Sequence, residues 1–149
     1  MLEQIKAELA KLVPLESKNG LFISGFDAED KLLFSNGVVK TDRSIETLAQ
    51  NFYTGIISKQ ATKIKKLILD VVINIKLEND PNTLIQLPIQ ERGLFLVQGD
   101  GQNSGVLLPN TKGISTIQQG LTAIKQKYNL TNQVSVFVFQ TKRSTISMT

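Results

Sequence analysis

Residues 92–110 read RGLFLVQGDGQNSGVLLPN and form the most informative stretch of the 149-residue chain. Two short apolar segments flank a polar, glycine-rich centre, and Pro109 follows the second segment. Apolar segments joined by Gly, Asn and Asp are typical of a β-hairpin, and a proline ends a strand because it has no N–H to donate. We therefore predict an antiparallel hairpin over residues 93–109, with its turn at residues 100–103.

Three other segments space their apolar residues three or four positions apart, as amphipathic helices do. The first ends before Pro14, and the second follows the N-cap candidate Ser44. The third starts near Ser115 or Thr116. Their apolar positions are Leu2, Ile5, Leu9 and Leu12; Ile45, Leu48, Phe52, Ile56 and Ile57; and Ile114, Ile117, Leu121, Ile124 and Tyr128.

The remaining apolar segments are rich in β-formers and indicate a sheet. Turn-forming residues occupy residues 27–31 and 35–37, and residues 78–82 form a loop. A proline makes residues 84–89 an irregular or edge piece, and the polar residues 141–149 are expected to form a frayed tail. Besides the hairpin, the expected strands are residues 20–26, 32–34, 66–77 and 134–139.

These elements predict an α+β fold in which a mainly antiparallel sheet carries about three packed helices. A chain of 149 residues suits one domain or two small, intimately packed lobes. We treat residues 1–149 as a single domain with a frayed tail from about residue 141. Hydrophobic residues make up 41% of the chain, so we expect a packed core rather than disorder.

The chain has no cysteine and no histidine. This composition excludes disulfides, thiolate or imidazole metal sites, cysteine nucleophiles and histidine-based catalytic triads. Charged residues interrupt residues 1–12, unlike a signal peptide, and apolar runs such as residues 71–73 are too short to span a bilayer. We expect a soluble cytoplasmic protein that acts away from membranes and folds without a metal or cofactor.

Charge is distributed unevenly along the chain. All 13 acidic residues lie at or before Asp100, whereas residues 101–149 carry five Lys and Arg. Another basic cluster lies at residues 59–66. Such an asymmetry can mark an acidic partner or a nucleic acid. We favour a solvated basic surface and expect no nucleic-acid partner, because the chain lacks the interleaved aromatic residues of a base-stacking platform.

Two polar groups resemble ligand sites but have simpler explanations. Asp27, Glu29 and Asp30 are close enough in sequence to bind a hard cation, yet they lack the spacing of a calcium loop, and we favour a solvated hairpin tip. The glycines of residues 99–105 suggest a phosphate loop, but no Gly-Lys-Ser/Thr follows and the next segment is a strand. We favour a turn there.

Asp70 lies within an apolar strand, and strand alternation leaves two alternatives for it. It is either a half-buried functional carboxylate or a residue of the solvent face beside Ile68 and Val72. We favour the solvent face, although Ile68 and Val72 then need a covering helix.

The glycine-led strand, glycine turn and Gly105-Val-Leu-Leu-Pro109 strand of the hairpin resemble the signature of the AMMECR-domain family. The resemblance extends in the same order over roughly residues 20–140. Residues 20–24 resemble the family's early Gly-Val-Phe-Val-Thr strand, and residues 69–77 resemble its Ile-Glu-Val-Ser-Val-Leu strand. Residues 134–139 match its closing aromatic strand. The resemblance implies an AMMECR-like α+β fold and a role beside an enzyme, since family members are often associated with Memo-like and radical SAM proteins.

The chain departs from the family at its central motif. Family members carry Leu-Arg-Gly-Cys-Ile-Gly, where this chain has Leu-Phe-Ser-Asn-Gly-Val at residues 33–38. Both the arginine and the cysteine are missing. We therefore name ligand-binding candidates and no catalytic residue: Ser35 and Asn36 in the altered motif, Arg43 as a replacement anion clamp, and Lys112 beside the hairpin.

Three functional hypotheses remain open. The first is a non-enzymatic binding or adaptor domain of AMMECR type, which binds a protein partner. The second is a small enzyme that uses carboxylate, serine or lysine chemistry, against which the lack of His, Cys and paired carboxylates weighs. The third treats residues 20–39 as part of a roadblock or longin-like scaffold for small GTPases. The strand order around residues 94–108 would distinguish this fold from an AMMECR-like fold.

Overall fold

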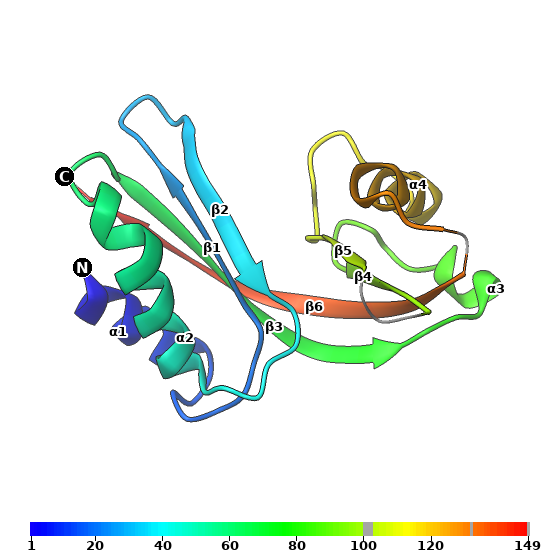
Figure 1. The fold of residues 1–149 in the computed structure, drawn as a ribbon, viewed down its shortest axis with the longest axis horizontal. Helices are drawn as coiled ribbons and strands as arrows, with labels where there is room; N and C mark the ends of the chain where they lie inside the picture. Colours follow the sequence, from blue (N-terminus) through cyan, green and yellow to red (C-terminus); the bar gives the residue numbers. More distant parts are fainter. Residues whose placement is uncertain (100–102, 132, 149) are drawn as a thin grey trace. The chain divides into compact units, whose positions relative to one another are not determined.

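The computed structural model describes residues 1–99, 103–131 and 133–148, and it confirms an α+β fold with an antiparallel sheet (Figure 1). Strand β1 pairs antiparallel with β2 and β3, and β4 pairs antiparallel with β5 and β6. The strand order is β2-β1-β3-β6-β4-β5. The strands are β1 (Leu21–Phe26), β2 (Leu32–Val38), β3 (Lys66–Leu77), β4 (Gly93–Gln98), β5 (Ser104–Leu107) and β6 (Val134–Ser147). The helices are α1 (Leu2–Leu12), α2 (Ile45–Phe52), α3 (Pro81–Leu84) and α4 (Ile117–Tyr128), with short turns η1 (Tyr53–Ile57) and η2 (Ser58–Gln60) after α2.

The chain divides into two compact units, which we describe separately. Unit 1 comprises Met1–Val72 and Lys142–Thr149, and unit 2 comprises Ile73–Thr141. Unit 2 is therefore inserted into unit 1 along the sequence. The long strands β3 and β6 each contribute one part to unit 1 and the other part to unit 2.

In unit 1, α1 and α2 cover one face of the strands (Figure 1). Alternate residues of β1 and β3 point to this face and are fully or almost fully buried: Leu21, Ile23, Leu67, Leu69 and Val71. The apolar stripes predicted for the two helices supply Ile5, Leu9, Ile45 and Leu48 to the same core. Each such side chain contributes about 1.5–3 kcal/mol on burial, so this layer stabilises unit 1.

The predicted turn at residues 35–37 is wrong, because β2 continues through it to Val38. Ser35 pairs with Ser24, and Gly37 pairs with Phe22. A Cβ atom on Gly37 would overlap the Phe22 ring, so the glycine is required for packing rather than for a turn. The residues that look like turn formers in the sequence are therefore paired residues of an edge strand.

The predicted frayed tail is also wrong, because β6 extends to Ser147. The Lys142 ammonium donates to the carbonyl of Leu12 at 3.2 Å, and the Ser144 hydroxyl donates to Glu8 at 2.6 Å. Ile146 is 7% exposed, on the same side of the strand as these two residues. Contacts with α1 thus hold a segment whose polar composition alone suggested disorder.

In unit 2, the predicted hairpin is confirmed. Leu94 lies opposite Leu107, and Leu96 lies opposite Gly105. The N–H of Gln98 donates to the carbonyl of Asn103 at 2.9 Å, next to the point where the predicted turn begins. Residues 100–102 of that turn lie outside the residues that the structure describes.

The helix α4 packs against this hairpin. Ile117 and Ile124 on α4 are buried together with Leu94 and Leu96 on β4. A Cβ atom on Gly105 would lie 2.5 Å from the Tyr128 ring, so only a glycine allows this close approach of helix and strand. The helix starts at the Thr116 N-cap, one of the two residues predicted for this position.

The loop predicted at residues 78–82 needs a correction, because the short helix α3 begins at Pro81. The Asp80 carboxylate accepts the N–H of Asn82 at 3.0 Å, and a proline at the first helical position needs no hydrogen-bond partner for its nitrogen. Leu84 at the end of α3 is 4% exposed, whereas the next residue, Ile85, is 66% exposed.

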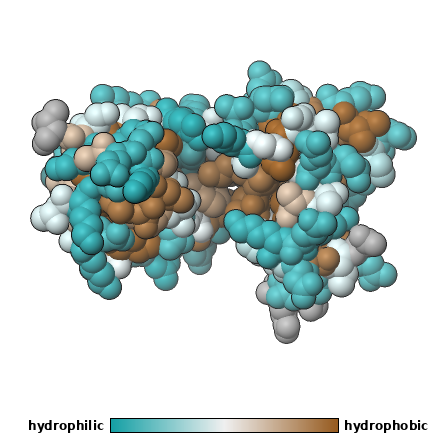
Figure 2. Space-filling view, turned by 90° about the horizontal axis from the view of Figure 1, so that it is seen from above, coloured by the Kyte–Doolittle hydropathy of each residue, from teal (hydrophilic) through white to brown (hydrophobic). Residues whose placement is uncertain are grey.

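Large apolar side chains remain exposed in both units. Figure 2 shows one face of the molecule, on which hydrophobic surface appears in patches among hydrophilic residues. Among the described residues, the exposed large apolar side chains are Leu32 in unit 1 and Leu77 and Ile85 in unit 2. Among these, Ile85 is next to a cleft, which we describe below.

Candidate functional site

The structure does not bring the four predicted site residues together into one hydrogen-bonded group. The Ser35 hydroxyl lies 3.1 Å from that of Ser24, and the side-chain Oδ1 of Asn36 accepts the backbone N–H of Gly37 at 2.9 Å. Ser35 and Asn36 are consecutive in β2, so their side chains point to opposite faces of the sheet. Both are exposed.

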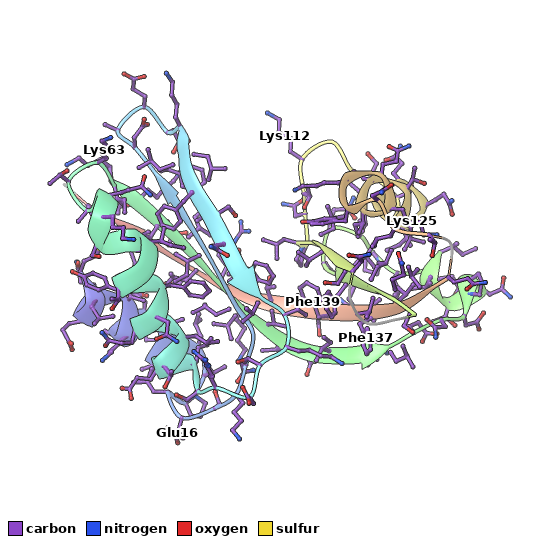
Figure 3. All side chains as sticks on the ribbon, in the orientation of Figure 1. Glu16, Lys63, Lys112, Lys125, Phe137 and Phe139 are labelled. Carbon is purple, nitrogen blue, oxygen red and sulfur yellow. The ribbon has the colours of Figure 1, made fainter. Side chains whose placement is uncertain are left out.

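The two predicted cations lie in loops. Arg43 precedes α2 and is exposed, and its N–H donates to the Thr41 hydroxyl at 3.0 Å. Lys112 lies in the segment between β5 and α4, where Figure 3 labels its exposed side chain. Arg43 belongs to unit 1 and Lys112 to unit 2. These cations are therefore parts of separately described units, and neither is built into a sheet.

The acidic turn of unit 1 also has its carboxylates engaged. Asp27 accepts the N–H groups of Glu29 and Lys31, both at 2.9 Å, and thereby fixes the turn between β1 and β2. Asp30 pairs with Lys66, and Glu29 pairs with Lys31. Within the described ranges, no three His, Cys, Asp or Glu residues are grouped so that they could hold a metal ion. The favoured interpretation as a hairpin tip agrees with this geometry.

The feature that the sequence did not predict is an ion pair on the sheet of unit 1. Asp70 lies opposite Phe22 on β1, on the face that α1 and α2 do not cover. The Arg143 guanidinium on β6 donates from Nε to Oδ1 of Asp70 at 2.9 Å and from Nη2 to Oδ2 at 3.1 Å. Such a two-fold contact fixes both planar groups. It also raises the pKa of Arg143 above its ordinary value, through the hydrogen bonds to Asp70.

Asp70 shares the face of Ile68 and Val72, as strand alternation predicts, but it is not solvated. Its side chain is 4% exposed, whereas that of Arg143 is 51% exposed. The arginine therefore covers the carboxylate, in place of the helix that we expected to cover this face. The signal in the sequence was the presence of three β-branched residues, Thr141, Thr145 and Ile146, which favour a strand that continues past residue 139.

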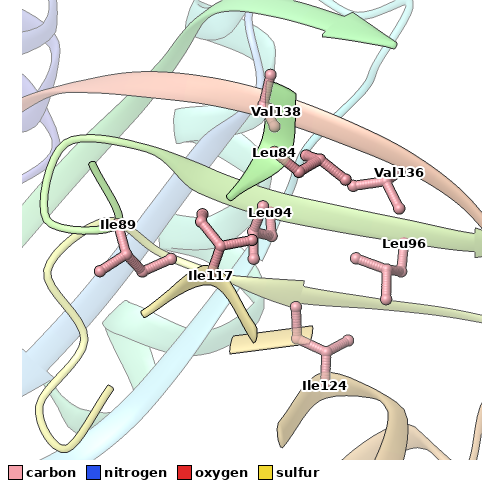
Figure 4. Close-up of a cluster of buried hydrophobic side chains, with 8 residues drawn as sticks. All are labelled: Leu84, Ile89, Leu94, Leu96, Ile117, Ile124, Val136 and Val138. Carbon is pink, nitrogen blue, oxygen red and sulfur yellow. The ribbon is translucent and has the colours of Figure 1, made fainter. Parts of the chain in front are cut away.

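Unit 2 contains a cleft of about 240 Å³ that is open to solvent. Its apolar surface comes from α3 and the following residue, from α4 and from the start of β6. The floor is part of the core, since Leu84 and Val136 belong to the buried cluster in Figure 4. The lining residues are Asn79, Pro81, Leu84, Ile85, Gln118, Leu121, Lys125, Val134 and Val136.

Three polar side chains accompany this apolar surface. The carbonyl oxygen of the Asn79 side chain accepts the N–H of Val136 at 2.8 Å, so its amide nitrogen carries the donors of that side chain. Gln118 and Lys125 come from α4, on which Figure 3 labels Lys125. The lining thus offers hydrogen-bond donors and one positive charge around an apolar floor, which suits binding rather than acid–base or nucleophilic chemistry.

Comparisons with known proteins support the fold. No protein-family model matches the chain, and no curated protein matches it. Among solved structures, the chain is similar to the uncharacterized protein PH0010 from Pyrococcus horikoshii, with a TM-score of 0.72 and 15% sequence identity. The match covers 88% of this chain and 75% of that chain. At this identity the similarity establishes a shared fold alone. In the described part of the chain, no helix is long and apolar enough to cross a membrane.

Proposed function

We propose that the chain is a non-enzymatic binding domain of AMMECR type, which binds an enzyme of the Memo-like or radical SAM class through the cleft of unit 2. The observation that carries this proposal is the cleft itself. An apolar floor next to an isoleucine that is 66% exposed is typical of a surface that a partner covers.

The energetics favour a covered Ile85. Removing a large aliphatic side chain from water contributes about 1.5–3 kcal/mol, which this chain does not gain at position 85 by its own folding. Buried apolar anchors near the centre of an interface provide most of its binding free energy, while the polar rim adds little. Ile85 and Leu121 have the position and chemistry of such anchors.

The chemistry of unit 1 gives less support to the enzymatic alternative. Asp70 is the one buried charged residue among the described positions, and the guanidinium of Arg143 engages both of its oxygens. A carboxylate held in this way stabilises the sheet, since breaking a buried ion pair costs about 3–5 kcal/mol. The sequence also lacks the histidine and cysteine that most acid–base and nucleophilic sites use.

The test is calorimetric titration of the purified chain with purified Memo-like and radical SAM proteins from the same organism. We expect saturable binding to one of them. Ile85→Ser should weaken this binding about tenfold or more, as loss of an interface anchor does. Leu32→Ser is the matched control, because Leu32 is also a large aliphatic residue, is 58% exposed and lies in unit 1.

The control variant should bind within about twofold of the unchanged chain. If neither enzyme binds, the proposed partner class is wrong. If Leu32→Ser weakens binding as much as Ile85→Ser does, the cleft of unit 2 is not the binding surface.

A further inference from the structure

We infer that Asn36 is a site of spontaneous covalent modification, at which the side-chain amide is lost through a cyclic imide with Gly37 and an aspartyl or isoaspartyl residue enters the edge strand β2. The inference goes beyond the proposed function, because Asn36 lies in unit 1 and the cleft lies in unit 2. It rests on a comparison of the two Asn-Gly pairs of the sequence, Asn19-Gly20 and Asn36-Gly37.

The reaction requires the two residues of an Asn-Gly pair and water. The backbone nitrogen of the glycine loses its proton to a base in the solvent and attacks Cγ of the asparagine, so an N–Cγ bond forms. The Cγ–Nδ2 bond breaks, and the amide nitrogen takes up a proton and leaves as ammonia. Glycine favours this step because it has no Cβ and its backbone adapts easily. Water then opens the imide at either carbonyl, which gives an aspartyl residue or an isoaspartyl residue whose backbone runs through Cγ.

In the pair Asn36-Gly37 the reacting groups are already adjacent. The backbone N–H of Gly37 donates to Oδ1 of Asn36 at 2.9 Å. Since Oδ1 is bonded to Cγ, this contact holds the electrophilic carbon next to the nitrogen that attacks it. The Asn36 side chain is exposed, so water and base have access to the pair.

The position of β2 in the sheet allows the folded protein to react. Ring closure turns the backbone of Asn36 out of its extended conformation, so the strand must open locally first. In the described part of the sheet, β2 is an edge strand that pairs with β1 alone. Opening an edge strand breaks hydrogen bonds on one side only, and such local openings cost less free energy than global unfolding.

The second pair is held in a way that opposes the reaction. The side-chain Nδ2 of Asn19 donates to the carbonyl of Val72 at 3.0 Å, and the carbonyl of Gly20 accepts the N–H of Val72 at 2.8 Å. Gly20 is buried, and a Cβ atom on it would lie 2.2 Å from the carbonyl oxygen of Val39. The same dipeptide is therefore clamped at one position and exposed at the other, so the fold selects Asn36.

The modification changes the edge of unit 1 in two ways. Either product adds a negative charge to β2. An isoaspartyl residue also lengthens the backbone by a methylene group, so Gly37 shifts from its register with Phe22. The Phe22 ring packs against Gly37 and is 7% exposed in the unmodified protein. Loss of the register therefore uncovers an aromatic side chain at this edge.

The experiment follows the full chain during incubation at neutral and mildly alkaline pH, with and without concentrated urea. Trypsin cleaves after Lys18, Lys31 and Lys40, so the two asparagines fall in separate peptides. Mass spectrometry measures the gain in mass when a carboxyl replaces the amide, and electron-transfer fragmentation identifies isoaspartate.

In the folded chain we expect Asn36 to react about tenfold faster than Asn19 or more. The rate should rise with pH, because the attacking nitrogen must lose its proton. In urea, where the fold no longer distinguishes the pairs, the two asparagines should react at similar rates. The variant Asn36→Gln keeps an amide but must close a larger ring, so its peptide should show no gain in mass.

Three outcomes would contradict the inference. If the peptide of Asn36 stays unchanged in the folded chain over the time in which urea converts both peptides, the edge strand protects this residue. If Asn19 and Asn36 react at equal rates in the folded chain, the fold does not select Asn36. A gain in mass that persists in the Asn36→Gln peptide would show that another reaction produces it.

Discussion

Asp70 in unit 1 is 3% exposed although it is charged, whereas Ile85 in unit 2 is 66% exposed although it is apolar. A buried charge is rare in proteins, whereas a single exposed apolar residue is common, so Ile85 is informative only because it lines a cleft. In unit 1 the chain itself compensates the cost of burying the charge of Asp70, because Arg143 binds the carboxylate through two hydrogen bonds. Unit 2 leaves Ile85 exposed at the rim of a cleft.

The two residues differ in what they indicate about function. A buried charge that is paired within the chain has a structural role and does not by itself indicate a functional site. An exposed apolar residue beside an open, apolar cleft is not explained by the stability of its own unit. This contrast makes the cleft the better candidate, although three of the four predicted site residues, Ser35, Asn36 and Arg43, lie in unit 1.

The largest expected effect is on stability. It tests whether a buried apolar residue of unit 2 contributes more to the free energy of unfolding than the exposed Ile85 does. Phe139 is fully buried and its ring lies against Gly93. Phe139→Ala should lower the free energy of unfolding by about 3–5 kcal/mol, measured by urea denaturation followed by circular dichroism. Ile85→Ser should change it by less than about 0.5 kcal/mol. Equal losses would show that Ile85 is part of the core and would remove the contrast.

The next effect tests the ion pair of unit 1. Arg143→Ala should destabilise the protein by about 3 kcal/mol, because it leaves the buried Asp70 without its partner. Arg43→Ala is the matched control, since Arg43 is exposed and should contribute less than about 1 kcal/mol. The same urea series measures both variants. Similar values for the two arginines would mean that solvent, rather than Arg143, satisfies Asp70.

A smaller, pH-dependent effect concerns the other polar contact of β6 in unit 1. The hydrogen bond from Ser144, and then that from Lys11, lowers the pKa of Glu8 below its ordinary value of 4.5. A carboxyl whose pKa is lower in the folded state stabilises the fold above its unfolded pKa, and this contribution is lost as the pH falls through the folded pKa. Ser144→Ala should raise the pKa of Glu8 toward 4.5, as observed by NMR titration.

Ser147→Ala is the control for this titration, because Ser147 lies on the same strand but on the opposite face from Ser144. It should leave the pKa of Glu8 unchanged. A shift of equal size in both variants would assign the effect to β6 as a whole rather than to the Ser144 hydroxyl.

The smallest expected effect is no change at all. The carboxylates of the acidic turn in unit 1 are engaged with backbone N–H groups and lysines. Thermal denaturation with and without a chelator should therefore give superimposable curves. A lower midpoint with chelator would assign a cation to Asp27, Glu29 and Asp30, and would add a second binding site to the comparison of the two units.

The parts of the fold that the sequence predicted are those determined by local pattern. The hairpin of β4 and β5, the apolar stripes of α1, α2 and α4, and the N-cap at Ser44 all depend on residues within one segment. The Ser44 hydroxyl accepts the N–H of Thr47 at 3.2 Å, as its position before the helix suggested. Local chemistry was sufficient in each case.

The errors arose where distant residues decide the outcome. Gly37 looks like a turn residue, but the Phe22 ring requires a glycine there. The polar segment at the end of β6 looks frayed, but it is held by Glu8 and Leu12, more than a hundred residues earlier in the chain. The cleft likewise combines α3, α4 and β6, and its residues share no motif in the sequence. Of the four predicted site residues, none lines it.

The insertion of unit 2 within unit 1 has a consequence for biosynthesis. Asp70 leaves the ribosome well before Arg143, and all of unit 2 is translated between them. The carboxylate of Asp70 therefore has no guanidinium partner until β6 has been translated. The N-terminal unit cannot complete its sheet by folding in the order of translation, as N-terminal domains commonly do. A nascent chain stalled before residue 142 would leave the edge of β3 in unit 1 without the neighbouring strand β6, and Asp70 without Arg143.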